Sequence, residues 1–179
     1  LSGSHRDQQL EAKRRRARSI ADHRDALSAM TRWGEFGNAR ERDLLNLLHP
    51  TVEDCVAGAT RLAAPLGSRR PEHPEFLTAR LGTGEVRPLV EVETTALTAI
   101  SPCPDELASL ERVCGRTGPA PVIADLRSVG AIGITGAREV RSGVARGVVV
   151  QLAALHSPAE LVMATLTSRR EREVWDWLD

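Results

Sequence analysis

The spacing of apolar residues changes near residue 76, dividing the chain into a helical first part and a mixed second part. Residues 7–31 contain no Gly or Pro and are rich in helix-forming residues, which predicts a long helix. Its apolar residues form a thin stripe with steps of seven and three residues, at Leu10, Ala17, Ile20, Leu27 and Met30. Because the rest of the segment is charged, we expect a mostly solvated helix that projects from the core or pairs with another helix.

Capping residues and apolar faces predict the helices that follow. Gly34 and Gly37 predict a break, and then a short second helix that ends at His49–Pro50. Thr51 is the expected N-cap of the next helix, whose apolar face consists of Val52, Cys55, Val56, Ala59 and Leu62.

Three more helices are predicted in the second part of the chain. Pro104 opens a helix over residues 104–114, and Gly115 stands where this helix should stop. Residues 144–155, "VARGVVVQLAAL", predict a strongly apolar helix, and residues 171–179, "EREVWDWLD", begin a last one.

Short apolar runs separated by turn residues predict strands. Residues 76–92 fit two short strands in a hairpin-like unit around Gly82 and Gly84. The runs "PVIADL", "AIGIT" and "LVMATLT", which begin at residues 121, 131 and 161, are three further strands. Strand–helix–strand spacing from residue 121 to 168 predicts a right-handed βαβ unit in a parallel sheet, and therefore an α/β fold behind a helical N-terminal part.

Charge and composition exclude some functions. Twenty-four basic residues balance 24 acidic ones, which argues against a chain built mainly to coat nucleic acid. No apolar run approaches the roughly 20 residues needed to span a bilayer. Three cysteines without a CxxC motif suggest reduced thiols in a cytosolic setting, with small buried side chains. Lys13 is the only lysine, so lysine-dependent chemistry has no other residue to use.

Residues 130–158 have the layout of a phosphate-binding loop, with an apolar run, a glycine-led turn and the start of a helix. The motif G-x-x-x-x-G-K-[ST] holds phosphates with backbone amides and a lysine, and binds Mg²⁺ with its hydroxyl. When Gly136 occupies its first position, the second glycine, the lysine and the hydroxyl residue are replaced by Arg141, Ser142 and Gly143.

The remaining chemistry of this segment is mixed. Glu139 would place a carboxylate beside any phosphate, which is the wrong sign. Arg138 and Arg141 can hold an anion, and Ser142 can contact a metal or water, but an arginine fork does not replace the lysine. Three interpretations stay open: an intact ATP site, residual binding of a nucleotide or another anion, and a structural turn, which we favour. The candidate binding residues are Gly136, Arg138, Arg141, Ser142 and Gly143.

Other polar residues carry weaker signals. We expect Asp125, at the end of a strand, to take part in a turn or loop ion pair, and His156 to help terminate the preceding helix. The five histidines have no ligand spacing, so no metal site is expected. Trp175 and Trp177 fall on different helix faces, which predicts that one of them belongs to the core.

Beyond residue 49, ordered stretches of the chain resemble one family. "HPTVEDCVAGATRL" is similar to its His-Pro-led helix, and "SRRPEHPEFLTARLGTGEV" resembles its arginine-rich loop and Leu-Gly-x-Gly strand turn. "GPAPVIADLRSVGAIGITG", "VVVQLAALHSPAELVMATL" and "EREVWDWLD" resemble its strand pair, its helix with a His-Ser-Pro cap and its Trp-x-Trp segment. The family is EccC, the membrane-anchored FtsK/SpoIIIE-type ATPases of actinobacterial type VII (ESX) secretion.

The resemblance implies an architecture. Residues 1–48 would be a helical stalk next to the membrane, and residues 49–179 a degenerate P-loop NTPase-like (FtsK/RecA-like) domain with a parallel sheet and helices, truncated at its C-terminal side. Two transmembrane helices would precede the stalk, and further FtsK-type ATPase domains would follow. We would then expect no cofactor in this piece, ATP and Mg²⁺ only in the parent protein, and a location at the cytoplasmic face of the cell membrane.

Three functions follow as hypotheses. The first is a non-hydrolysing ATPase-like module, with other secretion-complex subunits and the downstream ATPase domains as partners. The second is an active ATP-binding domain completed by residues outside this piece. The third is an adaptor that binds anionic lipid or a partner through the basic cluster Lys13–Arg18, a cluster that can equally be a solvated helix face.

Overall fold

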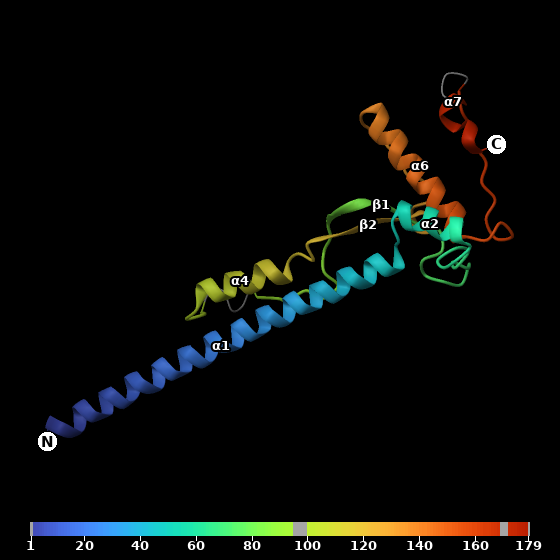
Figure 1. Ribbon diagram of the computed structural model, residues 1–179. Coiled ribbons are helices and arrows are strands. Elements are labelled where there is room, and N and C mark those ends of the chain that lie inside the picture. Colours follow the sequence, from blue (N-terminus) through green and yellow to red (C-terminus); the bar gives the residue numbers. More distant parts are fainter. Residues whose placement is uncertain (1, 95–99, 169–171, 179) are drawn as a thin grey trace. The chain divides into compact units, whose positions relative to one another are not determined.

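The computed structural model describes residues 2–94, 100–168 and 172–178 (Figure 1). Its helices are α1 (Ser2–Leu48), α2 (Val52–Arg61), α4 (Pro104–Cys114), α5 (Leu126–Val129), α6 (Arg138–Leu155), α7 (Arg172–Trp175) and the 3₁₀ helix η1 (Asp176–Leu178), and its strands are β1 (Thr78–Glu85) and β2 (Pro119–Asp125). The chain divides into two compact units, one formed by Leu1–Thr51 with Ala79–Ala124 and the other by Val52–Thr78 with Asp125–Asp179. Residues 79–124, which the sequence-based division placed in the second domain, thus belong to the same unit as α1.

The first helix, α1, runs without interruption through the two glycines that predicted a break, so that prediction is wrong. A Cβ atom on Gly34 would lie only 3.1 Å from Cys114 Sγ and 3.2 Å from Val113 Cγ1. The glycine therefore permits α4 to approach closely, and this packing offsets the cost of about 1 kcal/mol that glycine carries inside a helix. The helix ends before Pro50, where the sequence predicted a stop.

The core of the first unit lies between α1 and α4, which run side by side (Figure 1). Its buried residues are Leu27, Cys103, Leu107, Leu110 and Cys114, with Ile20 and Val92 packed against them. The predicted helix over residues 104–114 is confirmed, and the amide of Gly115 donates to Glu111 O at 2.8 Å to close its end. Only part of the predicted apolar stripe of α1 packs into this core. Leu10 and Met30, which belong to the stripe, remain about half exposed.

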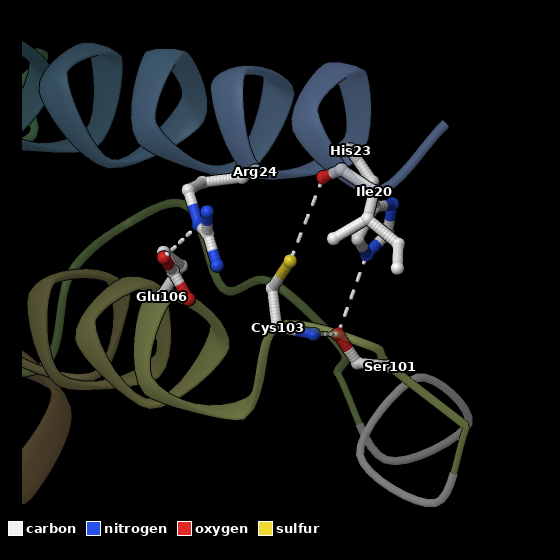
Figure 2. A network of polar contacts seen from close by, with 6 residues as sticks. All are labelled: Ile20, His23, Arg24, Ser101, Cys103 and Glu106. Carbon is white, nitrogen blue, oxygen red and sulfur yellow. Dashed lines mark hydrogen bonds and ion pairs between the residues drawn. The ribbon is translucent and has the colours of Figure 1, made fainter. Parts of the chain in front are cut away.

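Polar contacts fix both ends of α4 on α1. Figure 2 shows the first end, where the Arg24 guanidinium donates to the Glu106 carboxylate at 2.5 Å and Cys103 Sγ lies 3.7 Å from Ile20 O. At the other end, the Asn38 amide donates to Val113 O at 2.7 Å and to Arg116 O at 3.0 Å. These bonds satisfy carbonyls that a helix terminus leaves without intrahelical partners. Since residue numbers rise together on both helices, α1 and α4 are parallel.

The sheet consists of β1 and β2 alone in the part of the chain that the structure describes. Backbone bonds from Leu126 N to Leu77 O (2.9 Å) and from Thr117 N to Val86 O (3.2 Å) bracket the pair, so the two strands run antiparallel. The hairpin prediction is wrong because β1 continues through both glycines. A Cβ atom on Gly84 would lie 3.0 Å from Val122 Cγ2, so this glycine allows β2 to approach.

The predicted parallel βαβ unit does not form among the described residues. Residues 131–135 and 161–167 are not strands, although residues 119–125 form β2 much as expected. Val162 and Leu166 are 88% and 100% exposed, so the apolar pattern of their segment has no packing surface here. The structure thus confirms a mixed helix and strand composition with a long first helix, and the residues that it describes form no P-loop-type parallel sheet.

The second unit is built around α2 and α6, which pack against each other. Cys55 of α2 is buried with Ala154 and Leu155 of α6, and Val150 packs against them. The predicted α2 is confirmed with bounds that differ by one residue. In contrast, α6 begins at Arg138, six residues before the predicted start, and this extension bears directly on the candidate phosphate site.

Candidate functional site

The candidate phosphate-binding residues lie at the start of α6 and form no loop. Arg138, Arg141, Ser142 and Gly143 belong to its first two turns, and Gly136 lies two residues before the helix. All are exposed except Ser142, which is half-buried. Their binding of a nucleotide or another anion stays a prediction.

Backbone conformation explains the glycine that begins this segment. Gly136 has φ 128°, a region that side chains with a Cβ atom rarely adopt. The N-cap, Ala137, makes no side-chain hydrogen bond to the helix. Arg141 N donates to Ala137 O at 3.0 Å, so its amide is already used inside the helix. Glu139 stands in the first turn, where a carboxylate interacts favourably with the helix dipole and competes with any bound anion.

The opposite end of α6 is buried and hydrogen-bonded. His156, 3% exposed, is the C-cap residue, as the sequence predicted. Its Nδ1 lies 2.9 Å from Leu152 O, and its Nε2 accepts from Leu77 N at 3.1 Å. Because Nε2 accepts, the proton of the neutral ring belongs on Nδ1, from which it is donated to Leu152 O. The ring of Phe76 packs edge-on against the imidazole, with 5.0 Å between ring centroids.

Arg69 joins this end of α6 to the arginine-rich loop. Its backbone forms a parallel β-bridge with His156, and its amide donates to Leu155 O at 2.8 Å. Its guanidinium is buried and donates to Thr78 O at 2.5 Å. Arginine is seldom buried unless its guanidinium is hydrogen-bonded or ion-paired. We therefore infer that the Arg69 side chain stabilises this part of the fold. We call Arg69, Phe76 and His156 the α6 anchor.

Burial controls the ionisation of this region. Desolvation lowers the pKa of His156, and the nearby Arg69 charge lowers it further, against a hydrogen bond to Leu152 O that raises it. Desolvation also lowers the pKa of Arg69 and raises the pKa of the neighbouring Cys55 thiol. Both the lowered pKa of His156 and the raised pKa of Cys55 favour the uncharged side chain near neutral pH.

The sequence predicted only part of this anchor. It placed His156 at the end of a helix, but it assigned no role to Arg69 or Phe76. The sequence shows two adjacent arginines, Arg69 and Arg70, in a polar loop that contains prolines. Nothing in this pattern indicates which of the two side chains is buried. Arg70 is exposed and lies 3.5 Å from the Glu160 carboxylate.

Two other predictions have clear outcomes. Asp125 takes part in a turn, as expected: its carboxylate accepts from Arg127 N at 3.1 Å and from Ser128 N at 3.2 Å at the start of α5, and hydrogen bonds from Ser128 hold its pKa below the usual range. The prediction that one tryptophan is in the core is wrong. Trp175 and Trp177 stack on each other with 6.2 Å between ring centroids, and neither is buried.

The described part of the chain contains no group of three or more His, Cys, Asp or Glu side chains that could hold a metal ion. The three cysteines are free thiols, and each is buried as predicted. None of the described helices is both long and apolar enough to cross a membrane.

Comparison with curated proteins identifies the family. The chain is 31% identical to "ESX-4 secretion system protein EccC4" of Mycobacterium tuberculosis over 140 residues, which cover 75% of this chain and 11% of that protein. It is 24% identical over 143 residues to "ESX secretion system protein EccC" of Geobacillus thermodenitrificans. The chain is an EccC homologue.

A third relative, "ESX secretion system protein EccC" of Thermomonospora curvata, is 29% identical over 117 residues. The two EccC proteins just named are covered to 10% and 9% of their length, so this chain spans about a tenth of its relatives. No family model and no solved structure matches the chain. The EccC homology therefore rests on sequence.

Proposed function

We propose that this chain is the stalk and the first ATPase-like module of an EccC-type motor protein of a type VII secretion system, and that this module does not hydrolyse ATP. It links the membrane part of the motor to downstream FtsK-type ATPase domains at the cytoplasmic face of the cell membrane. Its partners are those domains and other subunits of the secretion complex, and it acts through contacts instead of turnover.

The observation that carries the proposal is the conformation of residues 136–143. The three defining positions of a phosphate loop that the sequence lacks are taken by Arg141, Ser142 and Gly143, which lie in the first turns of α6. A phosphate loop binds because its amides point freely at one anion, whereas here Arg141 N is used within the helix. A glycine turn and a helix are thus present, without a strand at residues 131–135 and without the lysine of the phosphate-loop motif at position 142.

The exposed apolar segment 161–167 supports the ATPase-like architecture. Its sequence has the apolar pattern of a strand, yet Val162, Met163 and Leu166 are exposed. The curated relatives are about ten times longer than the matched part. We propose that further sequence of such a protein pairs with residues 161–167 and completes a P-loop-like parallel sheet.

Titration with a fluorescent ATP analogue and Mg²⁺ tests the missing nucleotide site. We expect no saturable binding to the chain at micromolar concentrations, and no change for Arg141→Ala. Micromolar binding that Arg141→Ala abolishes, and that Arg32→Ala on α1 leaves intact, would overturn the proposal. In the full-length protein, the same Arg141→Ala substitution should leave secretion unchanged, while loss of a phosphate-loop lysine in a downstream domain should stop it.

The basic cluster of α1 supports a second role for the same chain. Lys13, Arg14, Arg15, Arg16 and Arg18 are all exposed. Near an anionic bilayer each basic residue contributes about 1 kcal/mol. We propose that this cluster binds the membrane surface beside the stalk. Cosedimentation with phosphatidylserine vesicles should fall as salt rises and should be lost when residues 14–16 are alanine, and binding to neutral vesicles of equal strength would contradict it.

A further inference from the structure

A second apolar stripe lies along α1 and is not covered by α4. Its six positions are 30, 33, 37, 40, 44 and 47, with steps of three and four residues, occupied by Met30, Trp33, Gly37, Arg40, Leu44 and Leu47. All six are exposed, and Trp33 and Leu47 reach 71% and 78%. This is the a/d spacing along which a second helix packs. We call these residues the α1 seam.

The α1 seam opens into an apolar groove within the first unit. The groove has a volume of about 540 Å³ and is lined by α1, by α4 and by the segment that follows β1. Its lining includes Met30, Trp33, Gly37, Leu89, Val90 and Leu110. No atom lies within 4 Å of a Cβ built on Gly37, so the groove leaves room for a bulky side chain above this glycine. Trp33 beside such a space has the chemistry of an interface hot spot.

The polar groups at the groove are already satisfied. The Asn38 amide donates to Val113 O and Arg116 O, and both oxygens of the Glu41 carboxylate lie 3.2 Å from Leu89 N. The charge that remains is Arg40, in the seam itself. It is exposed, and it makes no hydrogen bond or ion pair with the described residues. An apolar occupant with a carboxylate opposite Arg40 therefore complements the seam.

A second copy of the chain does not meet this requirement. In a parallel pair each Arg40 would face the Arg40 of the other copy. In an antiparallel pair centred on the seam it would face Gly37, because positions 37 and 40 then lie opposite each other. Neither arrangement places a carboxylate on the guanidinium, so charge complementarity favours a different chain.

We propose that the α1 seam and its groove bind an amphipathic helix of another protein, with a large apolar side chain above Gly37 and an Asp or Glu facing Arg40. This is the helix-in-groove mode of recognition. It depends on α1 and the segment beside it, and is independent of whether the start of α6 binds a nucleotide.

Two synthetic helices of about three heptads test the proposal. Both carry Leu at a and d positions, and they differ only at the central position, which is Glu in one and Lys in the other. Measured by fluorescence anisotropy with the 179-residue chain, the Glu peptide should bind at least about tenfold more tightly than the Lys peptide. Arg40→Glu should reverse that order, whereas Arg32→Glu, an exposed arginine off the seam, should preserve it.

The Trp33→Ala variant measures the contribution of the apolar groove to peptide binding separately from that of the Arg40 charge. It should weaken the Glu peptide by about tenfold or more, while Trp177→Ala leaves affinity unchanged. Circular dichroism checks that both variants stay folded. Equal affinity of the two peptides regardless of residue 40 would overturn the proposal. So would a dimer in sedimentation velocity that Trp33→Ala dissociates, or neutral-vesicle binding that Trp33→Ala abolishes, because these outcomes assign the seam to a second copy or to lipid.

Discussion

The two ends of α6 differ in how their backbone groups are satisfied. At the C-terminal end, a buried arginine, an aromatic ring and a neutral histidine form the α6 anchor, and both imidazole nitrogens are hydrogen-bonded. At the N-terminal end, the N-cap provides no side-chain bond and the neighbouring arginines are exposed. In a nucleotide-binding domain the N-terminal end would carry the chemistry. In this chain the buried and hydrogen-bonded side chains lie at the C-terminal end of α6 instead.

The largest expected effect follows from removing the guanidinium at the anchor. Arg69→Met keeps much of the apolar stem but leaves Thr78 O without the donor that lies 2.5 Å away. An unsatisfied buried carbonyl costs about 1–3 kcal/mol, and urea unfolding monitored by hydrogen exchange of residues 72–78 should show this loss. Arg70→Met, the exposed neighbour, is the control and should change stability by less than about 0.5 kcal/mol. Equal effects of the two variants would remove the contrast between the ends of α6.

Acid should act on the anchor through His156. The pKa of this imidazole is lowered from its ordinary value of 6.5 because burial disfavours the charged ring. The unfolded chain therefore binds the proton more readily, so stability is fully present above about pH 6.5 and is lost as the pH falls below it. We expect urea midpoints to fall between pH 7 and pH 5 in the native chain, and to fall less in His156→Gln. An identical pH slope in both proteins would contradict this.

A smaller effect, an increase in stability, is expected at the N-terminal end of α6. Ala137 has an extended conformation and offers no cap, so Ala137→Asp should accept a hydrogen bond from the first turn and interact with the helix dipole. We expect stabilisation of about 0.5–1 kcal/mol by urea unfolding. Ala137→Asn separates the hydrogen bond from the charge. A loss of stability in both variants would contradict the prediction that the N-terminal end of α6 lacks only a capping side chain.

The smallest effect concerns the arginine that begins α6. Arg138 is exposed, and no hydrogen bond or ion pair joins it to the described residues, so Arg138→Ala should change the free energy of unfolding by less than about 0.5 kcal/mol. Thermal unfolding followed by circular dichroism measures it. If the free energy of unfolding fell by more than about 1 kcal/mol, the N-terminal end of α6 would contribute to stability as much as the α6 anchor does.

Local signals predicted some elements because each of them is decided within a few residues. Pro104 and Gly115 set the limits of α4, and the apolar face that includes Cys55 set α2. The mismatch between the phosphate-loop motif and residues 141–143 was also readable directly, since the motif requires specific residue types at fixed spacing. EccC membership followed from ordered stretches of this kind, and curated relatives confirm it.

Tertiary contacts decided the rest. Gly34 and Gly84 looked like breaks, but each lies where a neighbouring helix or strand approaches within 3.1 Å or 3.0 Å of a would-be Cβ atom, and no sequence window contains that neighbour. Likewise, the apolar run at residues 161–167 has the sequence pattern of a strand. It can form a strand only when another strand hydrogen-bonds to it. The sequence by itself determined the limits of α4, the balance of charge and the mismatch with the phosphate-loop motif at residues 141–143. The tertiary structure decided which glycines permit close packing and which arginine is buried, because both depend on residues distant in the chain.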